Sequence, residues 1–336
     1  MRMKTFWGLL RQTAREWHAD KAHRLGAAVA FYCILTLVPL LAGAVALAGP
    51  VLGDRAARWR VVEQMRRIVG VRGGEAVETL VISTDTPETG AVALVGVSTL
   101  LFAATALFGQ LKDALNTMWG VHPVPGRGLR GLLRERFLSL SLVLGVASLL
   151  LVSLTLGLGL AALGDSLVDL LPGYATAVRA GHFAFSLGVV ATTFALVFKY
   201  LPDAHIAWRD VWVGAGITAV LHAVGVAAVR LYLDRSPVGV AYGAASSFVV
   251  LLLWVYYSSQ ILLFGAEFTQ VYANAHGDRI CPAADAECVT EQARARQGMP
   301  RGKRPGRRGP KEDGHAGGTR EAGSIAVRPS SRRRTR

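Results

Sequence analysis

The sequence predicts an all-α membrane protein: a bundle of six transmembrane helices with both termini in the cytoplasm and a disordered basic tail. The 336 residues are 52% hydrophobic and only 18% charged, with a mean hydropathy of +0.36, which is more apolar than a single soluble core requires. The apolar residues form six blocks of about 20 residues or more, the length that crosses a hydrocarbon core of about 30 Å. None of the blocks alternates like a membrane β-strand, so each is predicted to be a helix.

The predicted organisation has three parts. Residues 1–24 form an amphipathic basic leader, residues 25–275 the transmembrane domain and residues 276–336 the tail. The spans are predicted at about 25–49, 90–109, 137–163, 178–201, 211–233 and 244–273. The first block is too long for the apolar region of a signal peptide, about 7 to 15 residues, so it is interpreted as a span.

Lysine and arginine set the predicted orientation. The leader holds six of them, and the connection 110–136 holds five, whereas the connection 164–177 holds two aspartates and no cation. The positive-inside rule therefore places the leader and the connection 110–136 in the cytoplasm of a bacterial inner membrane. The connection 50–89 would then lie outside, with part of it forming an amphipathic helix on the membrane surface.

The last 60 residues carry 15 Lys or Arg against 7 Asp or Glu, among Gly, Pro and Ser, which is typical of a disordered tail. Three interpretations remain: a solubilising tail that fixes orientation, contact with anionic lipid headgroups, or binding of nucleic acid, which is not expected. Because such a tail buries nothing, truncation after Asn274 is expected to leave a folded protein in the membrane.

The residues contain no phosphate-binding loop, no nucleophile elbow and no pair of histidines with the spacing of a zinc protease. The eight histidines are scattered, and Cys281 and Cys288 lie in the tail with His276 but without a repeated Cys spacing. The sequence therefore predicts no catalytic residue, no metal site, no cofactor and no disulfide. Membrane lipids are the expected partners, and a homo-oligomer is compatible with the sequence.

Polar side chains follow one face of the sixth predicted span. Tyr256, Gln260, Glu267 and Gln270 lie at helical spacing. Because a charge in hydrocarbon costs about 2.5 to 3.5 kcal/mol, this stripe is predicted to face the bundle or a polar groove. We expect an ionised Glu267 near a cation, with Lys199 as the first candidate and Arg24 or Arg209 as alternatives. The stripe would serve either as an interhelical salt bridge or as a headgroup-facing surface.

The fifth predicted span carries Ala215, Ala219, Ala223 and Ala227 at every fourth position, a spacing that lets two membrane helices approach closely. His222, near its midpoint, is interpreted as an interhelical hydrogen-bond partner or, alternatively, a proton relay. In "LKDALNTMWGV" the apolar residues repeat at helical spacing, which predicts an amphipathic cytoplasmic helix with Trp119 in the headgroup layer. Asn116 is expected to cap or bond a neighbouring helix end.

Four ordered segments carry a resemblance to a known family. They are "GAAVAFYCILTLVPLL", "LKDALNTMWGV", "YLPDAHIAWRDVWVGAGITAVL" and "YGAASSFVVLLLWVYYSSQILLFGAEFTQVYA". Over about residues 20–275 the chain resembles the YihY/BrkB family of bacterial inner-membrane proteins. The resemblance implies six helical spans with cytoplasmic ends, and some members are linked to envelope lipid traffic. An old ribonuclease label in this family is not supported by any metal-ligand cluster in these residues.

Two functions remain open from the sequence. In the first, the polar stripe and the Pro39 break in the first span line a groove that carries a lipid or another amphiphile. In the second, the same polar groups only hold the bundle together, and the protein is structural or binds a partner. A cavity at the stripe favours the first function, and dry paired side chains favour the second.

Overall fold

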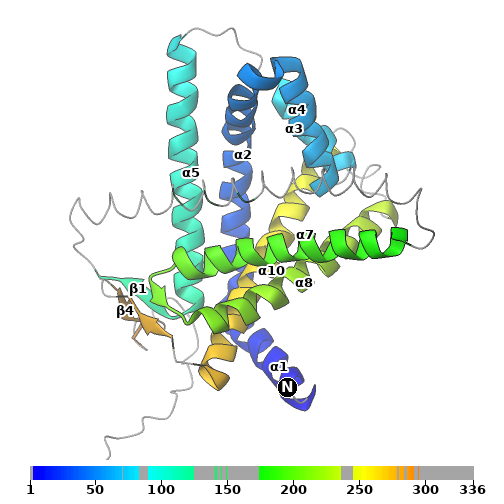
Figure 1. Ribbon diagram of the computed structural model, residues 1–336. Helices are drawn as coiled ribbons and strands as arrows, with labels where there is room; N and C mark the ends of the chain where they lie inside the picture. The colour runs from blue at the N-terminus through cyan, green and yellow to red at the C-terminus, as the bar shows by residue number, and fades with distance from the viewer. Residues whose placement is uncertain are drawn as a thin grey trace, which may run out of the picture. The chain divides into compact units, whose positions relative to one another are not determined.

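The computed structural model is mostly helical, with eight described helices and four short strands (Figure 1). It describes residues 3–69, 71–82, 90–124, 174–235, 245–277, 280–283 and 286–290, and the single residues 141, 145, 149 and 294. The helices are α1 (Met3–Ala19), α2 (Ala22–Leu52), α3 (Asp54–Val69), α4 (Val71–Ile82), α5 (Gly90–Met118), α7 (Tyr174–Tyr200), α8 (Trp208–Arg235) and α10 (Ser246–His276). The strands are β1 (Val121–Pro123), β2 (Ala204–His205), β3 (Cys281–Pro282) and β4 (Ala286–Cys288).

Three of the described helices are long and apolar enough to cross a membrane. They correspond to α7, α8 and α10, the fourth to sixth predicted spans. The predicted first and second spans fall within α2 and α5, and residues 22–37 of α2 form a shorter apolar segment. The predicted third span, 137–163, lies outside the described residues except for positions 141, 145 and 149.

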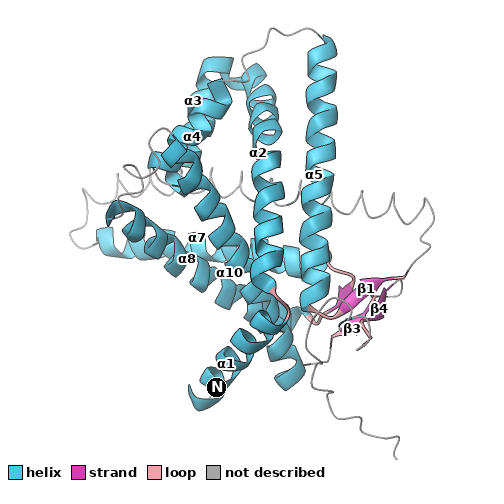
Figure 2. Ribbon diagram, turned by 180° about the vertical axis from the view of Figure 1, so that it is seen from behind, coloured by secondary structure: helices cyan, strands magenta, loops and turns pink. Residues whose placement is uncertain are grey.

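Helix α10 is the element around which the others pack: it contacts α1, α2, α4, α5 and α8. Helices α2 and α5 lie side by side in both views (Figure 2). The leader helix α1 is joined to α2 by a tight turn in which Lys21 has a φ of 55°. Leu9 of α1 packs against Phe268 and Val271, so the leader is docked on α10 through apolar contacts.

Helices α8 and α10 approach each other closely through two reciprocal pairs of small residues. A Cβ atom added to Gly214 would lie 1.9 Å from the hydroxyl of Thr269, and one added to Gly265 would lie 1.9 Å from the hydroxyl of Thr218. Each threonine hydroxyl donates to a carbonyl of its own helix, at 2.7 Å, which satisfies it within the interface. Of the predicted alanine series, Ala215 and Ala219 are buried, while Ala223 is half-buried and Ala227 is exposed.

The predicted interfacial helix of "LKDALNTMWGV" is the last part of α5, continuous with the second predicted span. Trp119 does not lie in the headgroup layer as expected: it is 4% exposed, and its indole N–H donates to the carbonyl of Ala266 at 3.0 Å. The prediction was wrong because Trp119 follows the helix end and turns back onto α10. Gly120, with a φ of 62°, allows that turn.

Asn116 bonds the end of a neighbouring helix, as the sequence predicts. Its amide donates to the carboxylate of Asp203 at 3.1 Å and accepts from the Asp203 backbone N–H at 2.9 Å, just beyond the end of α7. Lys112 also contacts the Asp203 carboxylate, at 3.2 Å. We call Lys112, Asn116 and Asp203 the polar hub; it ties α5 to the connection between α7 and α8.

The structure moves the predicted boundary of the tail. Residues 280–283, 286–290 and 294 belong to a C-terminal strap in which β4 pairs antiparallel with β1 and β3 pairs antiparallel with β2. The strap continues with a bond from the Val289 N–H to the Gly120 carbonyl and ends at Arg294, whose guanidinium pairs with Asp20 of the leader. Strands of two and three residues rich in Pro, Cys and Ala leave no periodic pattern in the sequence, so the strap could not be predicted.

The strap changes the expected effect of truncation. We expect a protein that ends after Pro300 to reach the membrane fraction and unfold at the same temperature as the full chain. A protein that ends after Asn274 loses both strand pairs and the Arg294–Asp20 pair, so its unfolding temperature should fall by several degrees or more. Thermal unfolding of the two truncated proteins in detergent measures this, and equal unfolding temperatures would contradict a structural role for the strap.

Candidate functional site

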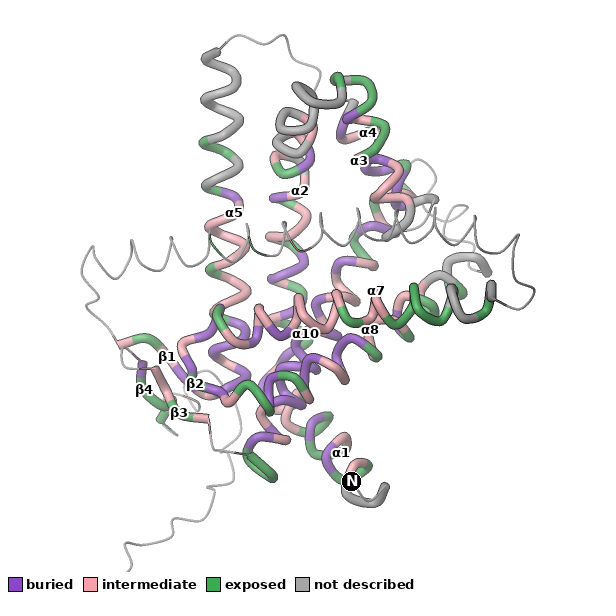
Figure 3. Tube along the Cα trace, in the orientation of Figure 1, coloured by how far each residue is buried: buried purple, intermediate pink, exposed green. Residues whose placement is uncertain are grey.

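The predicted polar stripe runs along the face of α10 that meets the leader and α2. Glu267 is completely buried, Gln260, Gln270 and Tyr256 are half-buried, and Asn274 is exposed beyond them. Buried residues concentrate in the second half of α10, where α1 lies against it (Figure 3). The stripe therefore points into the packed part of the protein around Glu267, and Tyr256 packs against the apolar cluster shared with α2 and α4.

The structure does not bring Lys199 to Glu267. The Lys199 ammonium donates to the carbonyl of Ile206 at 2.5 Å and lies 5.5 Å from the ring centre of Trp208. The alternative cations, Arg24 and Arg209, are exposed. Among the described residues, the charged groups that interact with Glu267 are Glu16 and Asp20 of α1 and its turn, and Arg294 of the strap.

Carboxyl groups outnumber cations around Glu267. Arg294 pairs directly with Asp20, so it does not form an ion pair with Glu267. Glu16 lies close enough to share a hydrogen bond with Glu267 if one of the two carries a proton, but neither oxygen of Glu267 accepts a bond from a fixed donor. The three carboxyl groups and one guanidinium form an acidic site whose charge the described side chains do not balance.

Further polar atoms without protein partners lie along the same interface. The Gln260 amide donates to the carbonyl of His23 at 3.3 Å, but its oxygen has no partner, and the indole N–H of Trp17 has none either. The Nε of Arg294 is also unpaired. We call Glu16, Trp17, Asp20, Gln260, Glu267 and Arg294 the polar seam; it holds five of the eight buried, unpaired side-chain atoms of the described residues.

These atoms define what the seam can bind. A buried polar group without a partner costs about 1 to 3 kcal/mol, so proteins rarely leave several together. The seam presents N–H donors from Trp17 and Arg294 and oxygen acceptors from Gln260 and Glu267. A small polar group with both donors and acceptors would satisfy them, which water or the headgroup of an amphiphile can do.

Asp20 gives the seam an expected pH dependence. Burial raises the pKa of its carboxyl group above the ordinary value of 3.8, and Arg294 opposes this shift without cancelling it. A carboxyl group with a raised pKa holds more protons in the folded state, so stability should fall as pH rises from about 3.8 through the folded pKa and level off above it. Thermal unfolding of the wild type should show this slope and Asp20→Asn should reduce it; identical slopes would contradict the assignment.

The remaining predicted site residues lie elsewhere. His222 is half-buried, and its ring contacts Phe194 edge-on at 5.9 Å, so it does not reach the seam by any described contact. Within the described ranges, no group of three or more His, Cys, Asp or Glu is arranged to hold a metal ion. The sequence analysis missed Glu16, Trp17, Asp20 and Arg294, and only the fold joins these residues to α10.

The apolar helices and the buried polar groups between them define an integral membrane protein of the multi-pass helical class. The chain belongs to the family described as "Virulence factor BrkB", which it matches over residues 13–287, so the resemblance to the YihY/BrkB family is confirmed. The matched region begins in α1 and ends in β4, and therefore includes both pairs of short strands.

Curated relatives support the same assignment. A UPF0761 membrane protein of Verminephrobacter eiseniae is 30% identical over 275 residues, which are 78% of this chain and 62% of that protein. Similar proteins of Pseudomonas paraeruginosa, 29% identical over 75% of this chain and 60% of the relative, and Psychromonas ingrahamii, 27% identical over 72% and 79%, carry the same family name. The chain thus spans about three fifths of the length of the first two. No solved structure matches it.

Proposed function

We propose that this protein is a six-span protein of the bacterial inner membrane that holds the headgroup of a lipid or another amphiphile in the polar seam, in the service of envelope biogenesis. The observation that carries the proposal is the group of five buried polar atoms without protein partners at Trp17, Gln260, Glu267 and Arg294. Donors and acceptors occur together there, which suits a polar headgroup better than an apolar chain.

The proposed topology has support from the strap. It contacts Asp20 of the leader and Gly120 to Pro123, which charge bias assigns to the cytoplasm, and Asp203 to His205, which lie on the same side if six spans alternate. With six spans, the C-terminal segment returns to the same side. The leader, the connection after α5, the connection before α8 and the strap therefore meet, and this topology places all four on the same side of the membrane. The basic residues after the strap would then lie near anionic lipid headgroups.

A structural role is the second candidate, and one observation favours it. Helix α10 packs against five of the other described helices, and its backbone accepts the buried bond from Trp119. A protein that only organises other membrane components would need such a rigid centre. It would not need unpaired polar atoms in the seam, and for this reason we favour headgroup binding. We propose no catalytic role.

Identification of bound molecules tests the proposal. Protein purified in mild detergent should carry a lipid or amphiphile class enriched over the membrane extract, detected by mass spectrometry. Glu267→Gln should reduce that enrichment, whereas Arg11→Gln, an exposed change on α1 outside the seam, should not. If the bound lipids match the extract in both the wild type and Glu267→Gln, the structural role is favoured and the headgroup proposal fails.

A further inference from the structure

Two carboxyl groups meet in the polar seam without a basic side chain between them. Glu267 of α10 is completely buried, and neither of its side-chain oxygens has a hydrogen-bond partner. The carboxyl group of Glu16 from α1 lies within hydrogen-bonding reach of Glu267. Two carboxylates this close repel each other, so the contact is stable only when a proton or another cation lies between them. The pair therefore offers one place for a cation.

The docking of α1 on α10 fixes this contact. Leu9, Thr13 and Glu16 lie on one face of the leader at helical spacing, and Leu9 packs against Phe268, the residue after Glu267. Leu9 and Thr13 are buried, whereas Glu16 is half-buried at the edge of the contact. Apolar packing thus holds two acidic side chains against each other, and a bound cation offsets the cost of their repulsion.

Glu16 is the member of the pair that can move. Its side chain is half-buried, and the polar group bonded to it is the amide of Gln12, an exposed residue, at 2.7 Å. An ammonium group that donates to both carboxylates, with bonds of about 2.8 Å, holds their oxygens about 2 Å farther apart than a shared proton does. A change of the Glu16 rotamer supplies this distance without any movement of the buried Glu267.

The charges around the pair leave it negative. Among the described residues, charged groups that interact with Glu267 come from α1 with its turn and from the strap, and α2, α4, α5 and α8 present none. Arg294 is paired with Asp20, so these two charges cancel. Glu16 and Glu267 together carry one negative charge with a shared proton and two without it. Replacement of the proton by an ammonium group leaves this charge unchanged, so the exchange adds no net charge to the interior.

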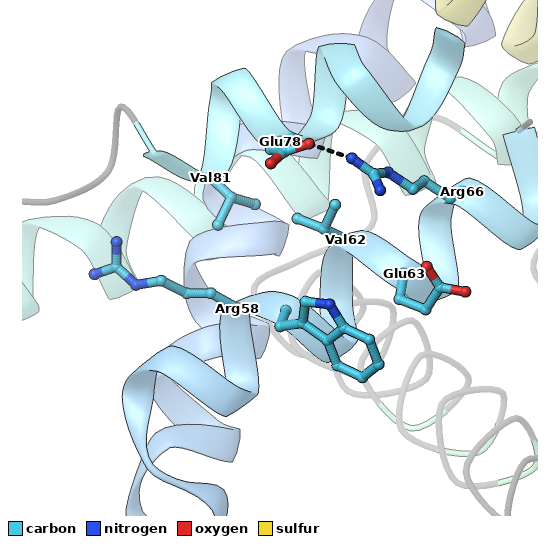
Figure 4. A pocket seen from close by; sticks show the side chains of 7 residues that line it. Arg58, Val62, Glu63, Arg66, Glu78 and Val81 are labelled. Atoms are coloured by element: carbon cyan, nitrogen blue, oxygen red, sulfur yellow. Dashed lines mark hydrogen bonds and ion pairs between the residues drawn. The ribbon is translucent and has the colours of Figure 1, made fainter. Parts of the chain in front are cut away.

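The acidic groups between α3 and α4 are arranged differently. Glu78 is bonded to Arg66 at 2.5 Å, and Glu63 points away from this pair (Figure 4). A carboxylate that has its own arginine does not require a further cation. Nearness of two acidic residues is therefore not sufficient for such a site, and the site in the seam arises because the two carboxyl groups face each other.

We propose that the Glu16–Glu267 pair is an exchange site, in which the primary ammonium group of an amphiphile's headgroup takes the place of the shared proton. This inference rests on the proposed function and names the chemical class of the headgroup. In the exchange, the O–H bond of the pair breaks and the proton leaves to water. Two N–H groups of the incoming ammonium then donate to Glu16 and Glu267, and no electrons are transferred.

An ammonium group fits the pair better than a metal ion does. Calcium and magnesium take about six or more oxygen ligands, and within the described ranges no group of three or more His, Cys, Asp or Glu is arranged to hold a metal. A primary ammonium group has three donors in all, and the two carboxylates accept two of them. A quaternary ammonium group has no N–H to donate, so the pair should distinguish the two kinds of amine.

Binding calorimetry with short-chain lipids tests the exchange. Phosphatidylethanolamine has a primary ammonium group, phosphatidylcholine a quaternary one, and phosphatidylglycerol no amine; each is titrated into the full-length protein in detergent. Titrations at about pH 5.5 in two buffers of different ionisation enthalpy count the protons released. The variants are Glu16→Gln, Glu267→Gln and the control Glu75→Gln, which removes an exposed carboxylate on α4. Thermal unfolding establishes that each variant is folded, and the proton count of the wild type requires no variant.

We expect the wild type to release about one proton for each phosphatidylethanolamine bound, and its affinity for this lipid to rise up to about tenfold from about pH 5 to about pH 6, because proton and ammonium compete. Phosphatidylethanolamine should bind about tenfold more tightly than phosphatidylcholine, the effect of about one charge-assisted hydrogen bond. Glu16→Gln should release no proton and lose this preference, whereas Glu75→Gln should behave like the wild type.

Three results would overturn the exchange: binding of phosphatidylethanolamine without proton release, equal affinities for phosphatidylethanolamine and phosphatidylcholine, or loss of proton release in Glu75→Gln. The proposed function would survive any of these results if Glu267→Gln still weakened the binding of at least one of the three lipids. If Glu267→Gln weakened none of them, headgroup binding in the seam would fail together with the exchange.

Discussion

Replacing Gly214 by alanine is expected to lower the free energy of unfolding by about 1 to 3 kcal/mol, the usual cost of forcing extra volume into a packed interface. The new methyl group would lie 1.9 Å from the hydroxyl oxygen of Thr269, and that side chain cannot turn away without losing its bond to the Gly265 carbonyl. Gly265→Ala should have a similar effect through Thr218. Replacement of either glycine by leucine should prevent the helices from packing.

The control for this prediction lies on the same helix. Gly216 has no heavy atom within 4 Å of an added Cβ, so Gly216→Ala should be neutral or should stabilise by up to about 1 kcal/mol, since alanine is the better helix former. Unfolding of the three alanine variants in detergent measures the difference. Equal stabilities for Gly214→Ala and Gly216→Ala would show that α8 and α10 do not approach at these glycines.

The second large effect is expected at the polar hub. The side chains of Lys112 and Asp203 are only 12% and 14% exposed, and Asp203 also bonds Asn116. Asp203→Ala removes the carboxylate that both Lys112 and Asn116 contact, and breaking a buried ion pair costs about 3 to 5 kcal/mol. Both α5 and the connection before α8 should loosen, and thermal unfolding should shift accordingly.

Two further variants make that prediction specific. Lys112→Met on the Asp203→Ala background should recover part of the lost stability, because the poorly exposed ammonium is then removed together with its carboxylate. Glu75→Ala, the loss of an exposed carboxylate on α4 away from the hub, should change stability by less than about 0.5 kcal/mol. If Glu75→Ala is as damaging as Asp203→Ala, stability depends on net charge in general and not on the hub.

Local sequence patterns predicted much of the fold. Apolar blocks of membrane length correspond to α7, α8 and α10, and the four-residue spacing of Ala215 and Ala219 located a face of α8 that is buried. The motif around Asn116 correctly predicted a bond to a neighbouring helix end. These features depend on residues within one helix, or on one residue and its immediate surroundings. They can therefore be predicted from the sequence alone.

The features that the sequence did not predict depend on contacts between distant residues. Arg294 reaches Asp20 only because β3 and β4 pair with the connections after α5 and α7. Lys199 carries a charge suitable for Glu267, yet it is engaged by the carbonyl of Ile206 and by the ring of Trp208 at the start of α8. Trp119 is buried because the chain reverses its direction at Gly120. The local amino-acid composition does not reveal this reversal.

The central claim is that the polar seam holds the headgroup of a particular lipid or amphiphile. Photo-crosslinking from position 260 tests it most directly, with position 253 as the control because Leu253 is exposed on the same helix. A photoreactive residue at 260 should capture one class of amphiphile in cells, while the residue at 253 captures the bulk lipid mixture. If position 260 captures only protein, or the same lipid mixture as position 253, the seam does not bind a headgroup and the polar stripe serves packing alone.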